Sequence, residues 1–442
     1  MYISENPFTQ QHLADFECTT TTQCMQLLTN LSTTFETYKH STVDQRLAII
    51  SHCATQLEQH KHDLAQHICT EMGKPITQAL GEIEKAIGLC HYYATQLPSY
   101  FNQLNSTNHI IQPLGIILAV MPWNFPVWQL FRVLIPQLAV GNVVLCKPAP
   151  NMNYLHNLLA DSLQDIPMID FARLSNKQVA NCINDSRIAG VTLTGSVRAG
   201  KAVGALAAGV VKPTVLELGG SDPFIVCADA NLDLACDKLM LSRFLNAGQS
   251  CIAAKRLLLH ADIKDTFLAK LSTALHTLTP GDPLDVSTTL GPVAKKSCLE
   301  QLSKQVNTGL SQQATITDQL ALNQPTGYFY PPTIIELTDS ANTLWSQEVF
   351  GPILPYLTFY TDSDALTLAN QTTFGLGASI WSNCTTRQQL FTHQLNAGMV
   401  AVNDMMVSSY DRPFGGIKQS GYGKELALEG LLSFANYKQI VV

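Results

Sequence analysis

The stretch Ile188-Ala-Gly-Val-Thr-Leu-Thr-Gly-Ser-Val-Arg-Ala-Gly200 decides the fold class. Its apolar first half predicts a buried strand at 188–193, and the residues after the glycine turn predict a helix at 197–208. A second β-prone run, 214–218, follows this helix. A strand, a crossover helix and another strand in this order form the repeating unit of a parallel sheet.

The same alternation extends in both directions along the chain. Before this stretch we expect a strand at 115–121, a helix at 126–140, a strand at 142–147 and a helix at 154–163. After it we expect a strand at 223–227, a helix at 232–247, a strand at 255–260 and a helix at 264–278. The sequence therefore predicts an α/β protein in which helices cover both faces of parallel sheets.

The region before the first of these strands is helical in pattern. Ser41 and Asp44 have the spacing of a capping box at its start. Gly73 and Pro75 predict a break, after which a second helix covers 77–93. We make no assignment for the residues that precede the capping box.

The composition is that of a folded protein with more than one domain. The chain has 442 residues, of which 46% are hydrophobic and 14% charged, so disorder is not expected. The net charge of −7 and the lack of basic runs argue against a nucleic-acid partner. Residues 1–19 do not have the pattern of a signal peptide, and Pro113, Pro122 and Pro126 interrupt the most apolar stretch. We therefore expect a cytoplasmic protein without a membrane span.

Twelve cysteines are scattered along the chain without the spacing of a zinc site or of a disulfide framework. We expect no metal and interpret most of them as small core residues. The run Asn246-Ala-Gly-Gln-Ser-Cys251 differs, because its cysteine lies just beyond the glycine that ends a helix. A cysteine on such a turn is a candidate nucleophile, although a buried structural role is commoner for a cysteine taken alone.

Two further runs supply polar groups that a nucleophilic cysteine would use. Glu217 ends a predicted strand, and a carboxylate in apolar surroundings acquires a raised pKa that suits a general base. Asn124 lies in the run Pro122-Trp-Asn-Phe-Pro126 and could donate an N–H to an oxyanion, together with the backbone N–H of Cys251. Each has a plainer alternative, a capping or ion-paired glutamate and an asparagine that stabilises a turn.

The turn Thr194-Gly-Ser196 opens the predicted helix that follows it. Backbone N–H groups and the helix dipole at such a position attract a pyrophosphate. The three-glycine dinucleotide fingerprint is missing, so the motif alone is weak. The runs Glu348-Val-Phe-Gly-Pro352 and Pro413-Phe-Gly-Gly416 are glycine–aromatic turns that chemistry alone does not explain.

From about Ser41 onward the chain resembles the aldehyde dehydrogenase superfamily, because five separated motifs occur in the order typical of that family. The runs 191–200 and 216–226 look most like bacterial succinate-semialdehyde dehydrogenases of the shorter type. The resemblance implies a Rossmann-type cofactor domain, an α/β catalytic domain and a small β-element that joins subunits into a homodimer or homotetramer. The implied boundaries are 1–94, 113–219 and 420–436 for the cofactor domain, 220–419 for the catalytic domain, and 95–112 with 437–442 for the oligomerisation element.

The resemblance also implies roles for the candidate catalytic residues. Cys251 matches the catalytic cysteine, Glu217 the general base and Asn124 the oxyanion asparagine. In the implied reaction the Cys251 thiolate attacks an aldehyde, hydride passes to NAD or NADP, and the resulting thioester is hydrolysed. Whether the bound cofactor or Glu217 favours the thiolate stays open.

The cofactor residues implied by the resemblance are Trp123, Lys147, Gly195, Ser196, Glu348 and Phe350. Lys147 matches a lysine that contacts the adenosine ribose, and Pro150 stands where NAD-preferring relatives often carry a glutamate that binds the ribose diol. Without that carboxylate a 2′-phosphate meets less repulsion and could pair with Lys147. We expect NADP to be accepted and predict no preference between NADP and NAD.

For the substrate, Arg132 and Ser408 match residues that bind the carboxylate in succinate-semialdehyde dehydrogenases. A second arginine of some of these enzymes is replaced here by Leu245, and Arg412 is a possible substitute. Arg132 has a salt bridge as its alternative role. Succinate semialdehyde is the expected substrate, with glutarate semialdehyde or an uncharged aliphatic or aromatic aldehyde as alternatives.

Three other functions remain to be compared with this one. An acylating relative that transfers the thioester to coenzyme A generally lacks the glutamate that Glu217 provides. A cofactor-free cysteine hydrolase needs a histidine beside Cys251, and His260 is predicted on a strand that leads away. A non-catalytic binding protein has no need of Cys251, Glu217 and Asn124 together.

Overall fold

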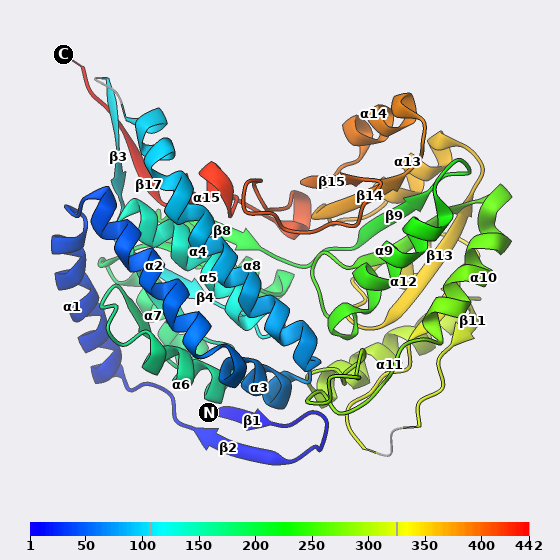
Figure 1. The fold of residues 1–442 in the computed structure, drawn as a ribbon, viewed down its shortest axis with the longest axis horizontal. Helices are drawn as coiled ribbons and strands as arrows, with labels where there is room; N and C mark the ends of the chain where they lie inside the picture. Colours follow the sequence, from blue (N-terminus) through cyan, green and yellow to red (C-terminus); the bar gives the residue numbers. More distant parts are fainter. Residues whose placement is uncertain (106–107, 324–325, 442) are drawn as a thin grey trace.

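Two parallel-stranded sheets form the cores of two halves that lie side by side in the computed structural model (Figure 1). The structure describes residues 1–105, 108–323 and 326–441. Residues 106–107 and 442 of the predicted oligomerisation element lie outside this part. The predicted α/β class is confirmed, and the strands and helices expected between 115 and 278 are present with ends that differ by at most three residues.

The first half contains a six-stranded sheet with β4 near its centre. Apolar side chains occupy both faces of its central strands, which is typical of a parallel sheet covered on both sides. Only the last short strand, β16, runs antiparallel to its neighbour. In sheet order the strands are β16 (Gly421–Tyr422), β8 (Thr214–Glu217), β7 (Ile188–Thr194), β4 (Ile116–Val120), β5 (Val143–Lys147) and β6 (Ile169–Phe171).

The helices of the first half surround this sheet, and α5 is buried along its whole length. Its predominantly apolar surface suits α5 to a place between the sheet and the outer helices α2 and α4. The helices are α1 (Thr21–Tyr38), α2 (Val43–Gln59), α3 (Lys61–Met72), α4 (Ile76–Leu104), α5 (Pro126–Val140), α6 (Asn153–Ser162), α7 (Asn176–Asn184), α8 (Val197–Gly209) and α15 (Ala427–Leu432).

The start of α2 corrects the predicted capping box by one residue. Thr42 is the cap, and its side chain and backbone exchange hydrogen bonds with Gln45. The Ser41 hydroxyl instead accepts a hydrogen bond from Arg46 Nε at 2.9 Å, so it is not available for the helix end. The predicted break after α3 is confirmed, since Gly73 ends that helix with φ +80°.

The second half contains a seven-stranded sheet in which only β11 is antiparallel. Its strands, in sheet order, are β11 (Thr315–Gln319), β12 (Thr333–Glu336), β13 (Ile353–Phe359), β10 (Ala254–His260), β9 (Asp222–Val226), β14 (Gly377–Trp381) and β15 (Met399–Val402). Its helices are α9 (Leu232–Phe244), α10 (Lys264–Leu275), α11 (Lys296–Ser311), α12 (Thr343–Ser346), α13 (Asp362–Asn370) and α14 (Thr385–Gln394).

The predicted oligomerisation element is only partly a β-structure. β3 (His109–Pro113) and β17 (Ala435–Gln439) form an antiparallel ribbon that projects from the first half (Figure 1). The expectation of a β-segment starting near residue 96 is wrong, because α4 continues to Leu104. The apolar stripe of α4 continues through Leu97 and keeps this end of the helix packed against the core.

A β-hairpin that the sequence did not predict lies at the bottom of the molecule in Figure 1. It consists of β1 (Tyr2–Glu5) and β2 (His12–Phe16). Ile3 N donates to Pro150 O at 3.0 Å in the first half, and Tyr328 N of the second half donates to Pro7 O at 2.9 Å. The hairpin therefore links the two halves. No helix in the described ranges has the length and apolar character needed to cross a membrane.

Candidate active site

Two cavities meet at Cys251, between the halves of the molecule. The first, called here the Ser196 cavity, has a volume of about 260 Å³. The second, the Trp128 cavity, has a volume of about 410 Å³. Cys251 and Gln129 line both cavities. A group bound in one cavity is therefore next to the same sulfur as a group bound in the other.

The Ser196 cavity brings together most of the residues predicted for catalysis and cofactor binding. They come from the ends of β7 and β8, from the turn before α5, and from the two segments that precede β10 and β13. The predicted residues that line it are Trp123, Asn124, Gly195, Ser196, Glu217, Cys251, Glu348 and Phe350. Lys147 is not among the residues that line this cavity.

Cys251 is held by a tight turn after α9. The helix ends at Phe244, earlier than predicted, because Asn246 and Ala247 adopt left-handed φ values of 53° and 51°. At Gly248 a Cβ atom would lie 2.5 Å from Gly351 O, so only glycine fits. Such strained backbone persists where the surrounding structure fixes it, and it typically occurs at functional sites.

Asn124 lies against this turn. Its Nδ2 donates to Gln249 O at 3.1 Å, which uses one of the two amide N–H groups. Its backbone carbonyl accepts hydrogen bonds from Lys74 Nζ at 2.8 Å and from Asn246 Nδ2 at 2.9 Å. The second Nδ2 hydrogen makes no hydrogen bond within the described part of the chain and is free for an oxyanion beside Cys251.

Lys74 and Glu82 support Asn124, and the sequence did not identify either of them. The two form a fully buried ion pair. Glu82 Oε1 also accepts hydrogen bonds from the backbone N–H groups of Val127 and Trp128 at 2.9 and 3.0 Å, so it caps the start of α5. This pair fixes the turn that carries Asn124.

Glu217 ends β8 as predicted, and its side chain is buried. Neither carboxylate oxygen has a hydrogen-bond partner within the described part of the chain. Burial raises the pKa of Glu217 well above its usual range, and the nearby Glu425 carboxylate raises it further. Arg132 and Lys424 lower this pKa by less. A carboxylate in this state is a stronger base than one in water.

Burial also raises the pKa of the Cys251 thiol, to about 11, against the opposing effect of Arg132 and Lys255. The resting cysteine is therefore a neutral thiol near pH 7. Lys255 Nζ donates to Cys251 O at 2.6 Å and lies 3.3 Å from Glu348 Oε1. The sulfur needs a base or an added positive charge before it can attack.

Glu348 is turned toward the glycine pair that follows Glu217. Its Oε1 accepts a hydrogen bond from Gly220 N at 3.0 Å, and a Cβ at Gly219 would lie 2.1 Å from its Oε2. The close approach explains why glycine occupies this position. Across the cavity the rings of Trp123 and Phe350 meet edge to face, with 5.9 Å between their centroids.

The turn Thr194-Gly-Ser196 leads from β7 into α8, as predicted. Ser196 caps α8, its Oγ accepting from Ala199 N at 3.3 Å, and Gly195 N donates to Glu217 O at 2.9 Å. Lys147 ends β5 in the same sheet, and burial lowers its pKa to about 8. The ring of Tyr2, from the N-terminal hairpin, lies 5.5 Å from Lys147 Nζ.

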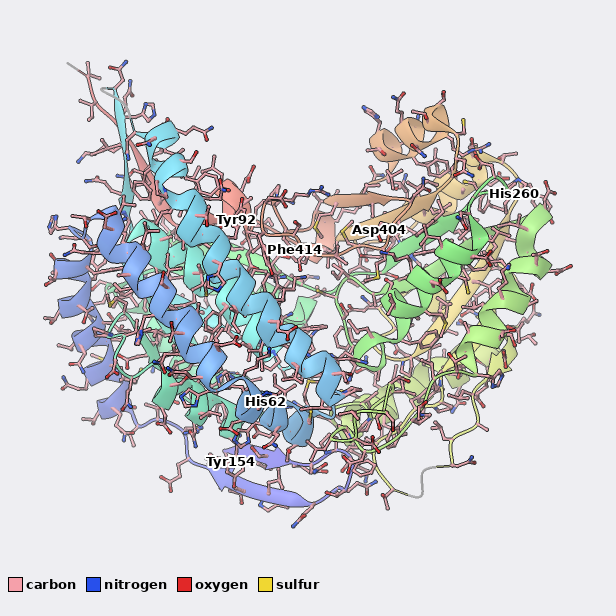
Figure 2. All side chains as sticks on the ribbon, viewed as in Figure 1. His62, Tyr92, Tyr154, His260, Asp404 and Phe414 are labelled. Carbon is pink, nitrogen blue, oxygen red and sulfur yellow. The ribbon has the colours of Figure 1, made fainter. Side chains whose placement is uncertain are left out.

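Arg132 and Ser408 both line the Trp128 cavity, and Arg132 has a carboxylate partner there, although its Nη2 is buried without a hydrogen-bond partner in the described part of the chain. Its guanidinium forms a buried ion pair with Glu425 and stacks over Phe414 at 4.1 Å. Figure 2 places Phe414 between the two halves. Ser408 Oγ accepts a hydrogen bond from Lys85 Nζ at 2.7 Å. Both predicted residues are therefore present, with partners that the sequence did not reveal.

Lys85 is the functional candidate that the sequence analysis missed. It lines the cavity from α4, together with Gln78, Gly81 and Glu82. Their spacing of three and four residues places them on one face of a helix, which was the available sequence signal. Leu245 also lines the cavity, whereas Arg412 is exposed and does not.

Two other features of the described residues limit the alternatives. No histidine is among the described residues that line either cavity, and His260 lies at the outer edge of the second half (Figure 2). A cysteine–histidine hydrolase would therefore lack its base. The described part of the chain also contains no group of three or more potential metal ligands.

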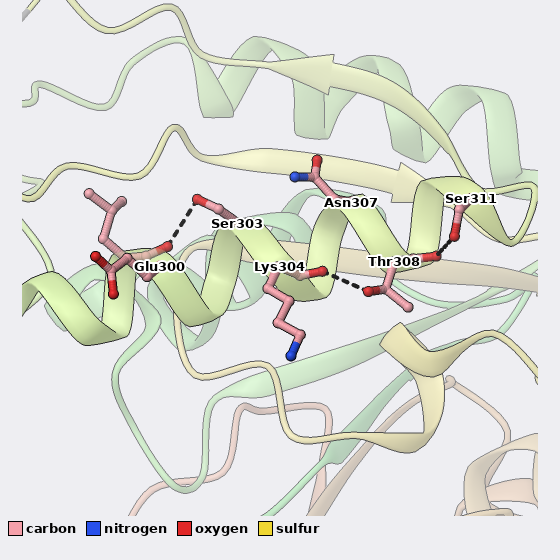
Figure 3. Close-up of a pocket in the computed structure, with 7 residues that line it drawn as sticks. Glu300, Ser303, Lys304, Asn307, Thr308 and Ser311 are labelled. Atoms are coloured by element: carbon pink, nitrogen blue, oxygen red, sulfur yellow. Dashed lines mark hydrogen bonds between the residues drawn. The ribbon is translucent and has the colours of Figure 1, made fainter.

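Figure 3 shows a hollow on α11 that is separate from both cavities. Ser303 Oγ donates to Leu299 O at 3.0 Å, and Thr308 Oγ1 donates to Lys304 O at 2.8 Å. These side chains follow a single helix and bond to their own backbone. They do not converge from several elements, so we assign no site there.

Comparisons with known proteins agree over the length of the chain. The aldehyde dehydrogenase family pattern matches residues 2–440. The chain is 39% identical to succinate-semialdehyde dehydrogenase (NADP+) of Mycobacterium leprae (strain TN), with 98% of each sequence covered. The solved structure of succinic semialdehyde dehydrogenase from Streptococcus pyogenes in complex with NADP+ superimposes with a TM-score of 0.96 at 31% identity, covering 100% of both chains. An NAD-dependent aldehyde dehydrogenase from Sinorhizobium meliloti gives a TM-score of 0.94 at 27% identity, covering 99% of this chain and 90% of that one.

Proposed function

Because the chain belongs to the aldehyde dehydrogenase family, we propose that it oxidises succinate semialdehyde to succinate with NADP or NAD as hydride acceptor. The observation that carries the proposal is the position of Cys251 where the two cavities meet. The Ser196 cavity offers the dinucleotide site, and the Trp128 cavity offers the aldehyde site. The curated relatives named for succinate semialdehyde and NADP support this choice.

The residues of the Ser196 cavity fit a dinucleotide. Ser196 and the first turn of α8 provide backbone N–H groups for the pyrophosphate, and Glu348 provides a carboxylate for the nicotinamide ribose. Lys147, at the end of β5 and outside the lining of this cavity, would meet the adenosine ribose. Four residues after it, the amide of Asn151 is buried without a hydrogen-bond partner in the described part of the chain. Pro150 leaves no carboxylate to repel a 2′-phosphate, so NADP is accepted. The bound dinucleotide supplies the acceptor for the hydride.

The protein's own residues carry the other steps. Cys251 attacks the aldehyde carbon, and the oxyanion accepts hydrogen bonds from the free Asn124 N–H and from the Cys251 backbone N–H. After hydride loss a thioester remains on Cys251. Glu217, whose pKa burial raises, takes a proton from a water molecule that attacks the thioester. Succinate then leaves through the Trp128 cavity.

The proposed domains follow the two sheets. The six-stranded half would be the cofactor domain, the seven-stranded half the catalytic domain, and the β3–β17 ribbon the oligomerisation element. The projection of this ribbon from the first half supports assembly into a homodimer or homotetramer (Figure 1). The cytoplasmic location stays a prediction from the sequence.

A spectrophotometric screen for the reduced nicotinamide tests the function. It compares succinate semialdehyde, glutarate semialdehyde, butanal and benzaldehyde, each with NAD and with NADP. We expect the highest kcat/KM for succinate semialdehyde and measurable turnover with NADP. Equal kcat/KM for butanal and succinate semialdehyde would refute the substrate, and a thousandfold preference for NAD would refute the role given to Pro150.

A further inference from the structure

Lys85 is a lysine of α4 that lines the Trp128 cavity. Its Nζ lies 2.7 Å from Ser408 Oγ and 4.7 Å from the centroid of the Trp128 ring. It is absent from the ion pairs of the described residues, although most of its side chain is buried. An ammonium group buried without a counter-ion is costly, and an anion that enters the cavity removes this cost.

The two nearest charged groups each have an ion-pair partner, although Arg132 keeps a buried Nη2 without a hydrogen-bond partner in the described part of the chain. Arg132 pairs with Glu425, and Glu82, one turn before Lys85 on α4, pairs with Lys74 and caps α5. Neither Leu245 nor the exposed Arg412 supplies a second cation. Lys85 is thus the cation of this cavity whose charge no carboxylate of the described chain neutralises at contact distance.

Ser408 is poised to act with it. Its Oγ accepts the hydrogen bond from Lys85, so its own O–H remains a donor. A substrate carboxylate that faces both side chains would receive one charge-assisted hydrogen bond from Lys85 and one hydrogen bond from Ser408. The Trp128 ring and Phe414 provide an apolar wall for the methylene groups. The cavity volume of about 410 Å³ accommodates an acid of this size.

We propose that Lys85, together with Ser408, binds the distal carboxylate of the substrate and selects ω-carboxy aldehydes over neutral ones. The proposal rests on the function proposed above. It adds a lysine on α4 to Arg132 and Ser408, which line the same cavity.

The test compares Lys85→Met with the wild-type enzyme on succinate semialdehyde and butanal. A hydrogen bond to a charged group is worth enough that we expect kcat/KM for succinate semialdehyde to fall about 100-fold. The value for butanal should change less than about threefold, since a neutral aldehyde does not use the charge. Lys85→Arg should recover part of the loss. Lys304→Met, on the outer face of α11, is the matched control and should leave both values unchanged.

Binding of the product succinate gives a second measurement that does not require turnover by the variant. The binding constant of succinate, measured by its protection of Cys251 from alkylation, should weaken about 100-fold in Lys85→Met, whereas that of butyrate should not change. If Lys85→Met does not fold, Ser408→Ala and Lys85→Gln are measured in the same way. Equal losses for succinate and butyrate, or no loss for either, would overturn the inference.

The two proposals fail in different ways. If the wild-type enzyme does not prefer succinate semialdehyde to butanal, the proposed substrate is wrong. If the wild-type preference is present but the Lys85 variants retain it, only the assignment of Lys85 is wrong. In that case Arg132→Met, tested in the same comparison, would show whether the ion-paired guanidinium binds the carboxylate after all.

Discussion

The Lys74 ammonium group donates a hydrogen bond to the backbone carbonyl of Asn124 at 2.8 Å, from inside the protein. The same group pairs with Glu82, whose carboxylate caps α5. One lysine thus connects the start of α4, the start of α5 and the turn that presents the candidate oxyanion donor. The candidate oxyanion site is supported by a buried ion pair, and Glu82 of this pair also lines the Trp128 cavity.

Lys74→Met is expected to destabilise the protein strongly. Removing one partner of a buried ion pair leaves the Glu82 charge uncompensated, which costs about 3–5 kcal/mol in the free energy of unfolding. Urea unfolding measures the loss. Lys61→Met is the matched control, because Lys61 pairs with Glu84 at the surface and its removal should cost less than about 1 kcal/mol. Similar small losses in both variants would contradict the importance of the buried pair.

Alkylation of Cys251 should report its raised pKa. In the enzyme without cofactor, the rate of reaction with iodoacetamide is expected to increase about tenfold per pH unit between pH 7 and pH 9, because the pKa is about 11. Labelling of Cys251 is followed by mass spectrometry, with Cys251→Ala as the blank for the exposed Cys384. A plateau at pH 8 would mean that the resting sulfur is already a thiolate.

Glu217→Gln separates thiol activation from thioester hydrolysis. We expect steady-state turnover to fall about 10²- to 10⁴-fold, because a general base has been removed. A burst of one reduced nicotinamide per active site should remain in rapid-mixing experiments if Glu217 acts on the hydrolytic water. Loss of the burst would instead assign Glu217 to deprotonation of Cys251.

Substrate preference should depend on pH through Lys85. Burial, together with the nearby charge of Arg132, lowers the pKa of Lys85 to about 8 against the opposing effect of Glu82. The cation is therefore present below pH 8 and lost above it. From pH 7 to pH 9 the ratio of kcat/KM for succinate semialdehyde to that for butanal should fall about tenfold.

The ratio removes the titration of Cys251 and Glu217, which affects both substrates alike. The other groups near Lys85 are the uncharged side chains of Ser408 and Trp128 and the charged side chains of Arg132 and Glu82, which pair with Glu425 and Lys74. Lys85→Arg should keep the ratio constant up to pH 9, because arginine stays charged. A ratio that is flat in the wild-type enzyme would separate the preference from the charge of Lys85.

Local patterns predicted the elements that lie in the core. α5 was predicted at its observed bounds, because an apolar run bounded by Pro126 and Gly141 leaves no other reading. The motifs around Cys251, Glu217 and Asn124 also indicated which residues would share a site. The strands from β11 to β15 and the N-terminal hairpin were not predicted, since their runs are short and owe their conformation to neighbouring strands.

The sequence pattern could not predict side-chain contacts between residues that are far apart along the chain. A salt bridge was the alternative role for Arg132, but its partner could not be named, because Glu425 is far from it along the chain and no local rule joins them. Lys85 looked like an ordinary residue of an outer helix for the same reason, since Ser408 belongs to the other end of the chain. The end of α9 was placed too late, because only the contact of Gly248 with Gly351 forces the turn.

The strand β16 adds to the first sheet beside β8, although the other strands of that sheet all lie before residue 218. During synthesis the ribosome releases β4 to β8 long before β16 and the Glu425 that pairs with Arg132. Until these residues are synthesised, the first half has an unpaired edge at β8 and its Arg132 lacks the Glu425 partner. A chain truncated before β16 would contain Cys251 but would lack Glu425, the ion-pair partner of Arg132.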